Sequence, residues 1–170
     1  PCPPVCAGSP NETPKNNATP IVITDPSYGL VTYSAQALSS STPDDGDNWT
    51  QCSNDSCRDE AWKITNSTAD AVDVTVTATP TSSFDIQANL YDCANSAVVC
   101  KDSEGSGTAE QFSYTLLPGQ TYYIVADSYY SGWSGCGYGN YSLTVTWGTA
   151  PSTCLAPSAW TTNPYTGALT

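Results

Sequence analysis

Apolar and polar side chains alternate without a break in the stretch Val72-Asp73-Val74-Thr75-Val76-Thr77-Ala78. This period of two is the pattern of a β-strand that buries one face and exposes the other. Five further segments alternate in the same way: Trp62 and Ile64; Phe84, Ile86, Ala88 and Leu90; Phe112, Tyr114 and Leu116; Tyr122, Ile124 and Ala126; and Tyr141, Leu143, Val145 and Trp147. Six strands are therefore expected between positions 49 and 147.

Turn-forming sequences separate these strands, and no segment shows the longer period of a helix. The turns are Thr79-Pro80, Glu104-Gly105-Ser106-Gly107, Pro118-Gly119 and the glycine-rich stretch 131–140. Antiparallel strands joined at this spacing favour two packed sheets over a barrel. The sequence therefore predicts an all-β fold, with an antiparallel β-sandwich core formed by residues 49–147.

Three segments flank this core: a proline-rich arm, a peripheral strand with an acidic turn, and a Thr/Pro-rich tail (residues 1–24, 25–48 and 148–170). The arm ends in a short β-rich run bracketed by prolines, which is typical of an edge strand or of a strand added to a neighbour. The large apolar side chains of the tail must pack on their own domain or on a neighbouring subunit. The candidate assembly residues are Ile21, Val22, Ile23, Trp160, Tyr165 and Leu169.

The chain is strongly acidic, with 4 basic against 16 acidic residues and a net charge of −12 at pH 7. Such a surface repels nucleic acids and anionic membranes. The chain contains no Met, even at position 1, which is expected if a leader has been removed or if the chain is a fragment. No apolar run is long enough to span a bilayer. A secreted protein, extracellular or at the cell surface, is the simpler expectation.

The eight cysteines indicate an oxidising compartment, because an even number of them in a processed chain favours disulfides. A zinc site is disfavoured, because the chain has neither His nor a Cys-x-x-Cys pair. The expected disulfide cysteines are Cys2, Cys6, Cys52, Cys57, Cys93, Cys100, Cys136 and Cys154. Proximity favours pairing Cys52 with Cys57, Cys93 with Cys100 and Cys136 with Cys154, although eight cysteines allow about a hundred arrangements.

Three motifs follow one another in the core: Asp85-x-x-x-x-Leu90-Tyr91-Asp92, Pro118-Gly119-Gln120-Thr121-Tyr122-Tyr123, and Asn140-Tyr141-Ser142-Leu143-Thr144-Val145. In this order they resemble the bacterial pre-peptidase C-terminal domain family and its collagen-binding relatives. The resemblance implies a jelly-roll-like β-sandwich, secretion, no catalytic role of its own, and in some members calcium bound near the N-terminal edge. The chain departs from the family in its eight cysteines, its proline-rich arm and a sequence that includes no protease domain.

Acidic residues cluster ahead of the first core strand, in the region where the resemblance places a metal in some family members. Calcium takes six to eight oxygen ligands, and clustered carboxylates can supply them. The alternative is an ordinary solvated turn around Gly46, and the stretch does not match the twelve-residue calcium-hand loop. The candidate calcium ligands are Asp44, Asp45, Asp47, Asp59 and Glu60. No organic cofactor is expected.

Six Asn-x-Ser/Thr sequons predict N-glycosylation, most of all in the arm, although a Thr-rich composition alone also generates sequons. They begin at Asn11, Asn17, Asn48, Asn54, Asn66 and Asn140.

Aromatic residues crowd the glycine-rich segment 127–141. Aromatic side chains on such a loop stack on sugar rings or anchor a protein partner, and the alternative is packing over the end of the sandwich. The candidate ligand-binding residues are Tyr129, Tyr130, Trp133 and Tyr138.

Catalysis finds little support, because a chain without His can form neither a Ser-His-Asp nor a Cys-His pair.

The leading hypothesis is a non-enzymatic structural protein, a glycosylated subunit of an extracellular filament or surface layer that self-assembles by exchange of its arm or tail strands. The alternative is a carbohydrate- or matrix-binding module of a secreted enzyme. Retention on a glycan or on collagen would distinguish the second hypothesis from the first.

Overall fold

In the computed structural model, the described residues are 20–38, 49, 51–52, 57–131 and 135–149. They form eleven strands: β1 (Ile21–Ile23), β2 (Tyr28–Leu38), β3 (Asp59–Asn66), β4 (Val72–Pro80), β5 (Ile86–Asp92), β6 (Ala97–Lys101), β7 (Glu110–Leu116), β8 (Thr121–Ser128), β9 (Tyr130–Ser131), β10 (Gly135–Cys136) and β11 (Gly139–Thr149). In this part of the chain, no helix is long and apolar enough to cross a membrane. The six expected strands are confirmed as β3, β4, β5, β7, β8 and β11.

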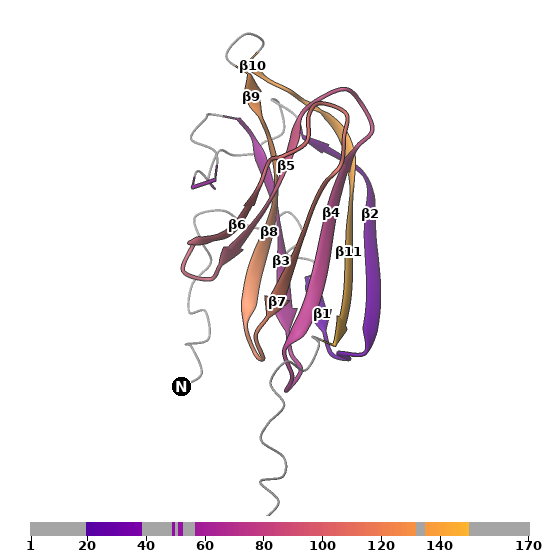
Figure 1. Ribbon diagram of the computed structural model, residues 1–170, viewed down its shortest axis with the longest axis vertical. Coiled ribbons are helices and arrows are strands. Elements are labelled where there is room, and N and C mark those ends of the chain that lie inside the picture. Colours follow the sequence, from indigo (N-terminus) through magenta and orange to yellow (C-terminus); the bar gives the residue numbers. More distant parts are fainter. Residues whose placement is uncertain (1–19, 39–48, 50, 53–56, 132–134, 150–170) are drawn as a thin grey trace, which may run out of the picture.

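The strands form two facing sheets. Sheet A has the order β1-β3-β8-β5-β6, and sheet B has the order β2-β11-β4-β7. Every pairing is antiparallel except that of β1 with β3, which is parallel. Figure 1 shows the sheets as two layers, with the β9–β10 ribbon at the upper end. The predicted all-β sandwich is confirmed.

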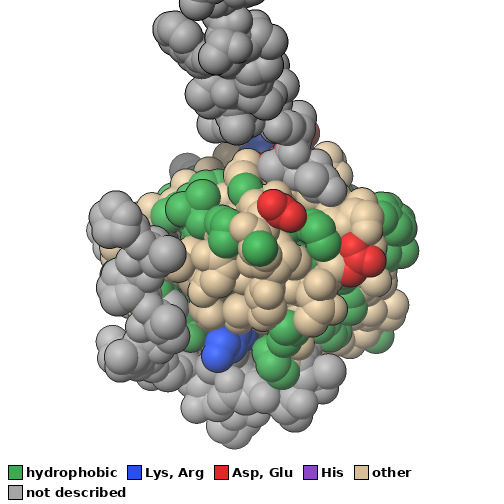
Figure 2. Space-filling view, turned by 90° about the horizontal axis from the view of Figure 1, so that it is seen from below, with side chains coloured by type: hydrophobic (Ala, Val, Ile, Leu, Met, Phe, Trp, Pro, Cys, Tyr) green, Lys and Arg blue, Asp and Glu red, His purple; other side chains and the backbone are tan. Residues whose placement is uncertain are grey.

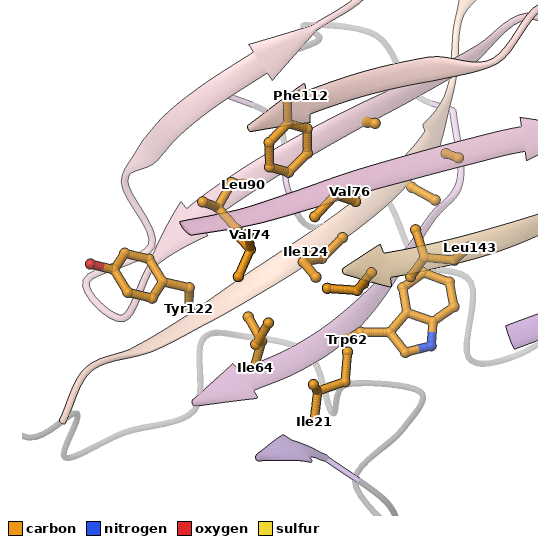
Figure 3. Packing of buried hydrophobic residues seen from close by; sticks show 14 of the residues in the cluster. Ile21, Trp62, Ile64, Val74, Val76, Leu90, Phe112, Tyr122, Ile124 and Leu143 are labelled. Atoms are coloured by element: carbon orange, nitrogen blue, oxygen red, sulfur yellow. The ribbon is translucent and has the colours of Figure 1, made fainter. Parts of the chain in front are cut away.

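The main core lies between the sheets, where the alternating apolar side chains of both layers meet. Val74 and Val76 of sheet B and Ile124 of sheet A are at most 1% exposed. Figure 3 shows these residues in one cluster with Trp62, Ile64 and other apolar side chains of sheet A. Each fully buried side chain of this size contributes about 1.5–3 kcal/mol relative to an exposed one, so this cluster is the main source of stability.

The outer face of sheet A is buried as well, which the alternating pattern did not predict. A second cluster covers it, formed by Trp49, Ala61, Tyr91, Tyr123 and Val125. The ring of Trp49 lies 4.9 Å from that of Tyr91 and 5.3 Å from that of Tyr123. Trp49 is 1% exposed, so the segment that carries it closes this face of the sheet against solvent.

Two disulfides fasten this segment and the start of β3 to the sandwich. Cys52 is bonded to Cys100, and Cys57 is bonded to Cys136. Cys93 is disulfide-bonded as well. The predicted pairs of Cys52 with Cys57, Cys93 with Cys100 and Cys136 with Cys154 are therefore wrong.

The pairing predicted from proximity in sequence fails because the two cysteines of the β5–β6 hairpin do not lie opposite each other. Cys100 lies opposite Asn89, whereas Cys93 lies four residues further on, in the turn. At roughly 3.3 Å per residue, the two positions are more than about 10 Å apart, beyond the reach of a disulfide. Cys52 instead lies over the hairpin, where its backbone N–H donates to the Tyr91 hydroxyl at 3.2 Å.

The β1 run docks on its own chain. Ile21 and Ile23 are 5% and 0% exposed and belong to the main core, whereas Val22 is 46% exposed. Their register pairs Ile21 with Ile64 of β3. The expectation of an edge strand is confirmed, and its apolar side chains complete the sandwich that carries them.

Strand β2 contains a bulge at Ala35. Its register against β11 shifts between Tyr141 and Leu143, where β2 holds one residue more than its partner. Ala35 has a φ of 54°. This left-handed backbone crowds a Cβ atom against the following carbonyl, so alanine is strained there and glycine is not.

We therefore expect Ala35→Gly to raise the free energy of unfolding by about 0.5–1 kcal/mol, because the strain relieved exceeds the added chain entropy of glycine. Ala37→Gly is the matched control, because Ala37 lies in the same strand without a positive φ. That variant should lose stability by a similar amount. Urea denaturation measures both, and an equal loss in the two variants would contradict the strain at Ala35.

Candidate functional site

Asp59 and Glu60 serve as internal acceptors. Each is 1% exposed. Asp59 Oδ2 accepts the backbone N–H of Trp49 at 2.9 Å, and Glu60 Oε2 accepts the hydroxyl of Tyr141. Because consecutive residues of a strand point to opposite faces, these two carboxylates cannot bind one ion together. The calcium site stays a prediction, and the structure does not bring Asp59 and Glu60 together in it.

The remaining calcium candidates, Asp44, Asp45 and Asp47, lie outside the described residues. Within the described ranges, no group of three or more His, Cys, Asp or Glu side chains is arranged to hold a metal.

Asn66 is a structural residue and not an accessible sequon. It is 0% exposed. Its side-chain amide donates to the carbonyls of Asp70 at 2.8 Å and Leu116 at 3.0 Å, and its Oδ1 accepts the N–H of Thr68 at 3.0 Å. A glycan on this nitrogen would replace one of the two N–H donors, and the buried side chain leaves no room for it, so Asn66 is not accessible to glycosylation in the folded chain. Asn140 is exposed. The sequons at Asn11, Asn17, Asn48 and Asn54 lie outside the described residues.

The glycine-rich aromatic segment lies against the upper end of the sandwich. A Cβ added at Gly139 would lie 2.6 Å from the Phe84 ring, so glycine permits this close approach. Tyr129 and Tyr138 are 40% and 37% exposed. Trp133 and the side chain of Tyr130 lie outside the described residues. The two described tyrosines are therefore accessible to a ligand.

A groove with a volume of about 280 Å³ opens at one end of the sandwich, beside the β5–β6 and β7–β8 turns. Strands β6 and β7 are edge strands of sheets A and B, and both contribute to the lining of the groove through Val98 and Tyr114. The groove is lined by Asp92, Cys93, Ala94, Val98, Tyr114, Leu117, Gln120, Thr121 and Tyr122.

Two tyrosines form the aromatic part of the groove. Tyr114 of β7 and Tyr122 of β8 pack edge to face, with ring centroids 5.6 Å apart and an interplanar angle of 65°. Burial is the main cause that raises the pKa of the Tyr122 hydroxyl. Figure 3 shows this hydroxyl pointing away from the core cluster. Both tyrosines line the groove, although Tyr122 is only 5% exposed.

Polar side chains complete the groove on the β5 and β8 sides. Asp92 lies opposite Tyr122 in the register of the two strands. Its Oδ1 accepts the backbone N–H groups of Ala94 at 2.9 Å and Ser96 at 2.8 Å, which fixes the carboxylate in the turn. Gln120 follows a Pro-Gly turn closed by its own N–H to the Leu117 carbonyl at 3.2 Å. Rigid turns thus hold the hydrogen-bonding groups in place.

The end of the molecule nearest the bottom of Figure 1 carries few charges for so acidic a chain. In Figure 2, apolar and uncharged polar side chains cover most of the described surface, and acidic and basic side chains are scattered. The whole chain carries a net charge of −12. The excess negative charge is therefore not concentrated on this end of the sandwich.

At Tyr114 and Tyr122 the sequence pattern gives no sign of the groove, because both fit the alternation of core residues. One signal could have found it: Asp92 continues the inward alternation of Ile86, Ala88 and Leu90. A carboxylate at the next position of that series indicates that the strand leaves the apolar core there, because an unpaired charge is not buried in such a core.

No family model and no curated protein matches the chain. Among solved structures, it resembles the pre-peptidase C-terminal domain of a collagenase from Bacillus anthracis, with 12% identity and a TM-score of 0.43 over 74% of this chain and 95% of that one. A domain of the family that the sequence motifs predicted is thus among the similar structures.

Two further similar structures have other roles in their names. The PliG protein from Aeromonas hydrophila, a periplasmic inhibitor of g-type lysozyme, shares 12% identity at a TM-score of 0.42, over 76% of this chain and 96% of that one. A family 35 carbohydrate binding module from Clostridium thermocellum shares 11% identity at a TM-score of 0.36, over 71% and 92%. These similarities concern the general sandwich architecture alone.

Proposed function

We propose that the protein is a secreted, non-catalytic module that binds a neutral glycan in the groove beside Tyr114 and Tyr122. The observation that carries the proposal is the juxtaposition of an aromatic pair with fixed polar groups in a groove of about 280 Å³. Sugar rings present apolar C–H faces that pack on aromatic rings and hydroxyls that bond to carboxylates and amides. Asp92, Gln120 and the tyrosine hydroxyls supply such partners.

The charge of the groove selects a neutral ligand. Of the described residues that line it, Asp92 carries a negative charge and none carries a positive one. A uronic acid or a sulfated sugar would therefore approach a carboxylate on a protein of net charge −12 without a compensating cation. Neutral oligosaccharides meet no such repulsion.

The same lining supports binding without hydrolysis. Glycoside hydrolysis normally requires two carboxyl groups on opposite sides of the scissile bond. Asp92 is the single carboxylate among the described residues of the groove. Its Oδ1 already accepts two backbone N–H groups, which hold the carboxylate in the β5–β6 turn.

Tyr114→Ala is expected to weaken glycan binding at least about tenfold, because it removes half of the aromatic pair. Calorimetric titration with neutral oligosaccharides of several linkages, together with a sulfated oligosaccharide, measures the change. Tyr129→Ala is the matched control, since Tyr129 is an exposed tyrosine of the other candidate site. Tyr114→Phe should retain most of the affinity, because it keeps the ring.

Two outcomes would overturn the groove as the binding site. In the first, Tyr129→Ala abolishes binding and Tyr114→Ala does not, which would place the ligand on the aromatic loop. In the second, none of the neutral oligosaccharides is bound at millimolar concentration.

Strand exchange between subunits of a filament is less well supported. Ile21 and Ile23 fill the core of their own chain, so a neighbour could use them only if this sandwich opened. The other assembly candidates, Trp160, Tyr165 and Leu169, lie outside the described residues.

A further inference from the structure

Strand β2 is an edge strand of sheet B. Among the described residues, the order β2-β11-β4-β7 leaves one side of β2 without a paired strand. Every second residue of such a strand directs its N–H and C=O groups away from the sheet. Soluble proteins guard long edges with charged residues, proline or bulges. The eleven residues of β2 include no charged residue and no proline, and the bulge at Ala35 interrupts only the second half.

The first half of β2 also displays apolar side chains. Tyr28 is 70% exposed and Leu30 is 55% exposed, the highest values among the large hydrophobic residues that the structure describes. Both lie on the outer face of sheet B together with Thr32, because alternate residues of a strand share a face. Residues 28–33 therefore combine backbone N–H and C=O groups that face away from the sheet with exposed apolar side chains.

We infer that this segment pairs with the same segment of a second copy of the chain, in antiparallel orientation about a two-fold axis. In a register centred on Leu30, the two Leu30 side chains face each other, and Tyr28 faces Thr32 of the second copy. The contact would join two B sheets into one continuous sheet. Such a self-complementary contact is closed, so it yields a dimer and not a fibre.

The distribution of charge permits a second copy at this edge. Two chains that each carry −12 repel one another, so they can meet only where the surface is neutral. The outer face beside β2 is neutral across β11 and most of β4, where the register places hydroxyl side chains in rows: Thr144 and Thr146 of β11, and Thr75 and Thr77 of β4. The nearest charge in those rows is Asp73, opposite Gly148.

The proposed dimer leaves the groove free. Strands β2 and β7 lie at opposite edges of sheet B, and the groove opens beside β7. Two grooves would therefore face away from the shared edge, and a polymeric ligand could engage both with a gain in avidity. The dimer itself does not depend on glycan binding.

Sedimentation velocity over a range of protein concentrations tests the pairing. The unchanged protein should approach twice its monomer mass of 17.9 kDa at high concentration. Leu30→Glu should shift the midpoint of dimer formation at least about tenfold upward in concentration, because it places two carboxylates opposite each other in the edge contact. Leu117→Glu is the matched control, since Leu117 is 48% exposed beside the groove, and it should dimerise like the unchanged protein.

Hydrogen exchange gives a second readout. It uses the unchanged protein, so it does not depend on whether a variant folds correctly. Amides of residues 28–33 should exchange more slowly as concentration rises, while those of the β7 edge should not change. A protein that stays monomeric at millimolar concentration, or a dimer that Leu30→Glu leaves intact without protection of β2, would overturn the inference.

Discussion

Replacement of both Cys57 and Cys136 by alanine is expected to lower the free energy of unfolding by about 4 kcal/mol. The bond spans a sequence separation of 79 residues, and a cross-link removes more chain entropy from the unfolded state as the closed loop grows. In a domain of this size the loss corresponds to a fall in Tm of roughly 10 °C. Thermal and urea denaturation under non-reducing conditions measure it.

The size of this effect distinguishes the observed pairing from local pairing. If Cys57 were bonded to Cys52, five positions away, the lost bond would have closed a small loop and would cost only about 2 kcal/mol. The double variant of Cys52 and Cys100 is the matched control. Its bond spans 48 residues, and it should lose nearly as much stability, because loop entropy grows slowly with length. Cross-linked peptides that join Cys52 to Cys57 in a non-reducing digest would refute the pairing.

The alternating pattern predicted most of the core strands but not all of them. It identified β4 from Val72 to Ala78, because one side of β4 is buried and the other exposed. It missed β6, whose sequence Ala97-Val98-Val99-Cys100-Lys101 is a short apolar run without alternation. Such a run is recognised as a strand only by its partner, and β6 pairs with β5 in the sheet.

Disulfide pairing and the groove could not be predicted, because both depend on strand order. Period-two alternation assigns side chains to faces but does not say which strands are neighbours. Asp92 and Tyr122 are thirty positions apart in sequence, and only the pairing of β5 with β8 brings them opposite each other. Asn66 shows a related limit, since its sequon gives no sign that the amide is bonded inside the fold.

The family resemblance and the residue patterns contributed different parts of the prediction. The order of the motifs pointed to a sandwich of the pre-peptidase C-terminal type, and the two sheets confirm the sandwich. Its implied calcium region included Asp59 and Glu60, which the structure uses as buried acceptors on opposite faces of sheet A. The architecture that the resemblance implied is confirmed, whereas the calcium site stays a prediction.

Trp49→Ala is expected to lower the free energy of unfolding by about 3–5 kcal/mol, the range for truncation of a large buried aromatic residue. Trp49 is 1% exposed and packs against Tyr91 and Tyr123 on the outer face of sheet A. Its backbone also ties that face together, because its N–H donates to Asp59 at 2.9 Å and its carbonyl accepts the Tyr91 hydroxyl at 2.6 Å.

The loss should spread beyond a single cavity, because the Tyr91 hydroxyl depends on being covered. Burial is the main cause that raises the pKa of Tyr91 to about 12, with Asp127 and Asp59 adding to the rise. In Trp49→Ala, water reaches this hydroxyl, so its pKa should fall toward 10.0, the ordinary value. Trp49→Phe, which keeps an apolar ring over the tyrosines, should lose less than half as much stability and keep the pKa raised.

Urea denaturation followed by circular dichroism measures the stability of both variants, and ultraviolet titration of tyrosine measures the pKa. The folded state with Trp49 gains stability from a neutral Tyr91 at pH values below 10.0 and loses it as the pH rises through about 12. Trp49→Ala should therefore show a weaker decline of stability over that interval. A loss of under about 1 kcal/mol, with an unchanged tyrosine titration, would mean that Trp49 does not close this face of the sheet and that the disulfides alone hold the segment in place.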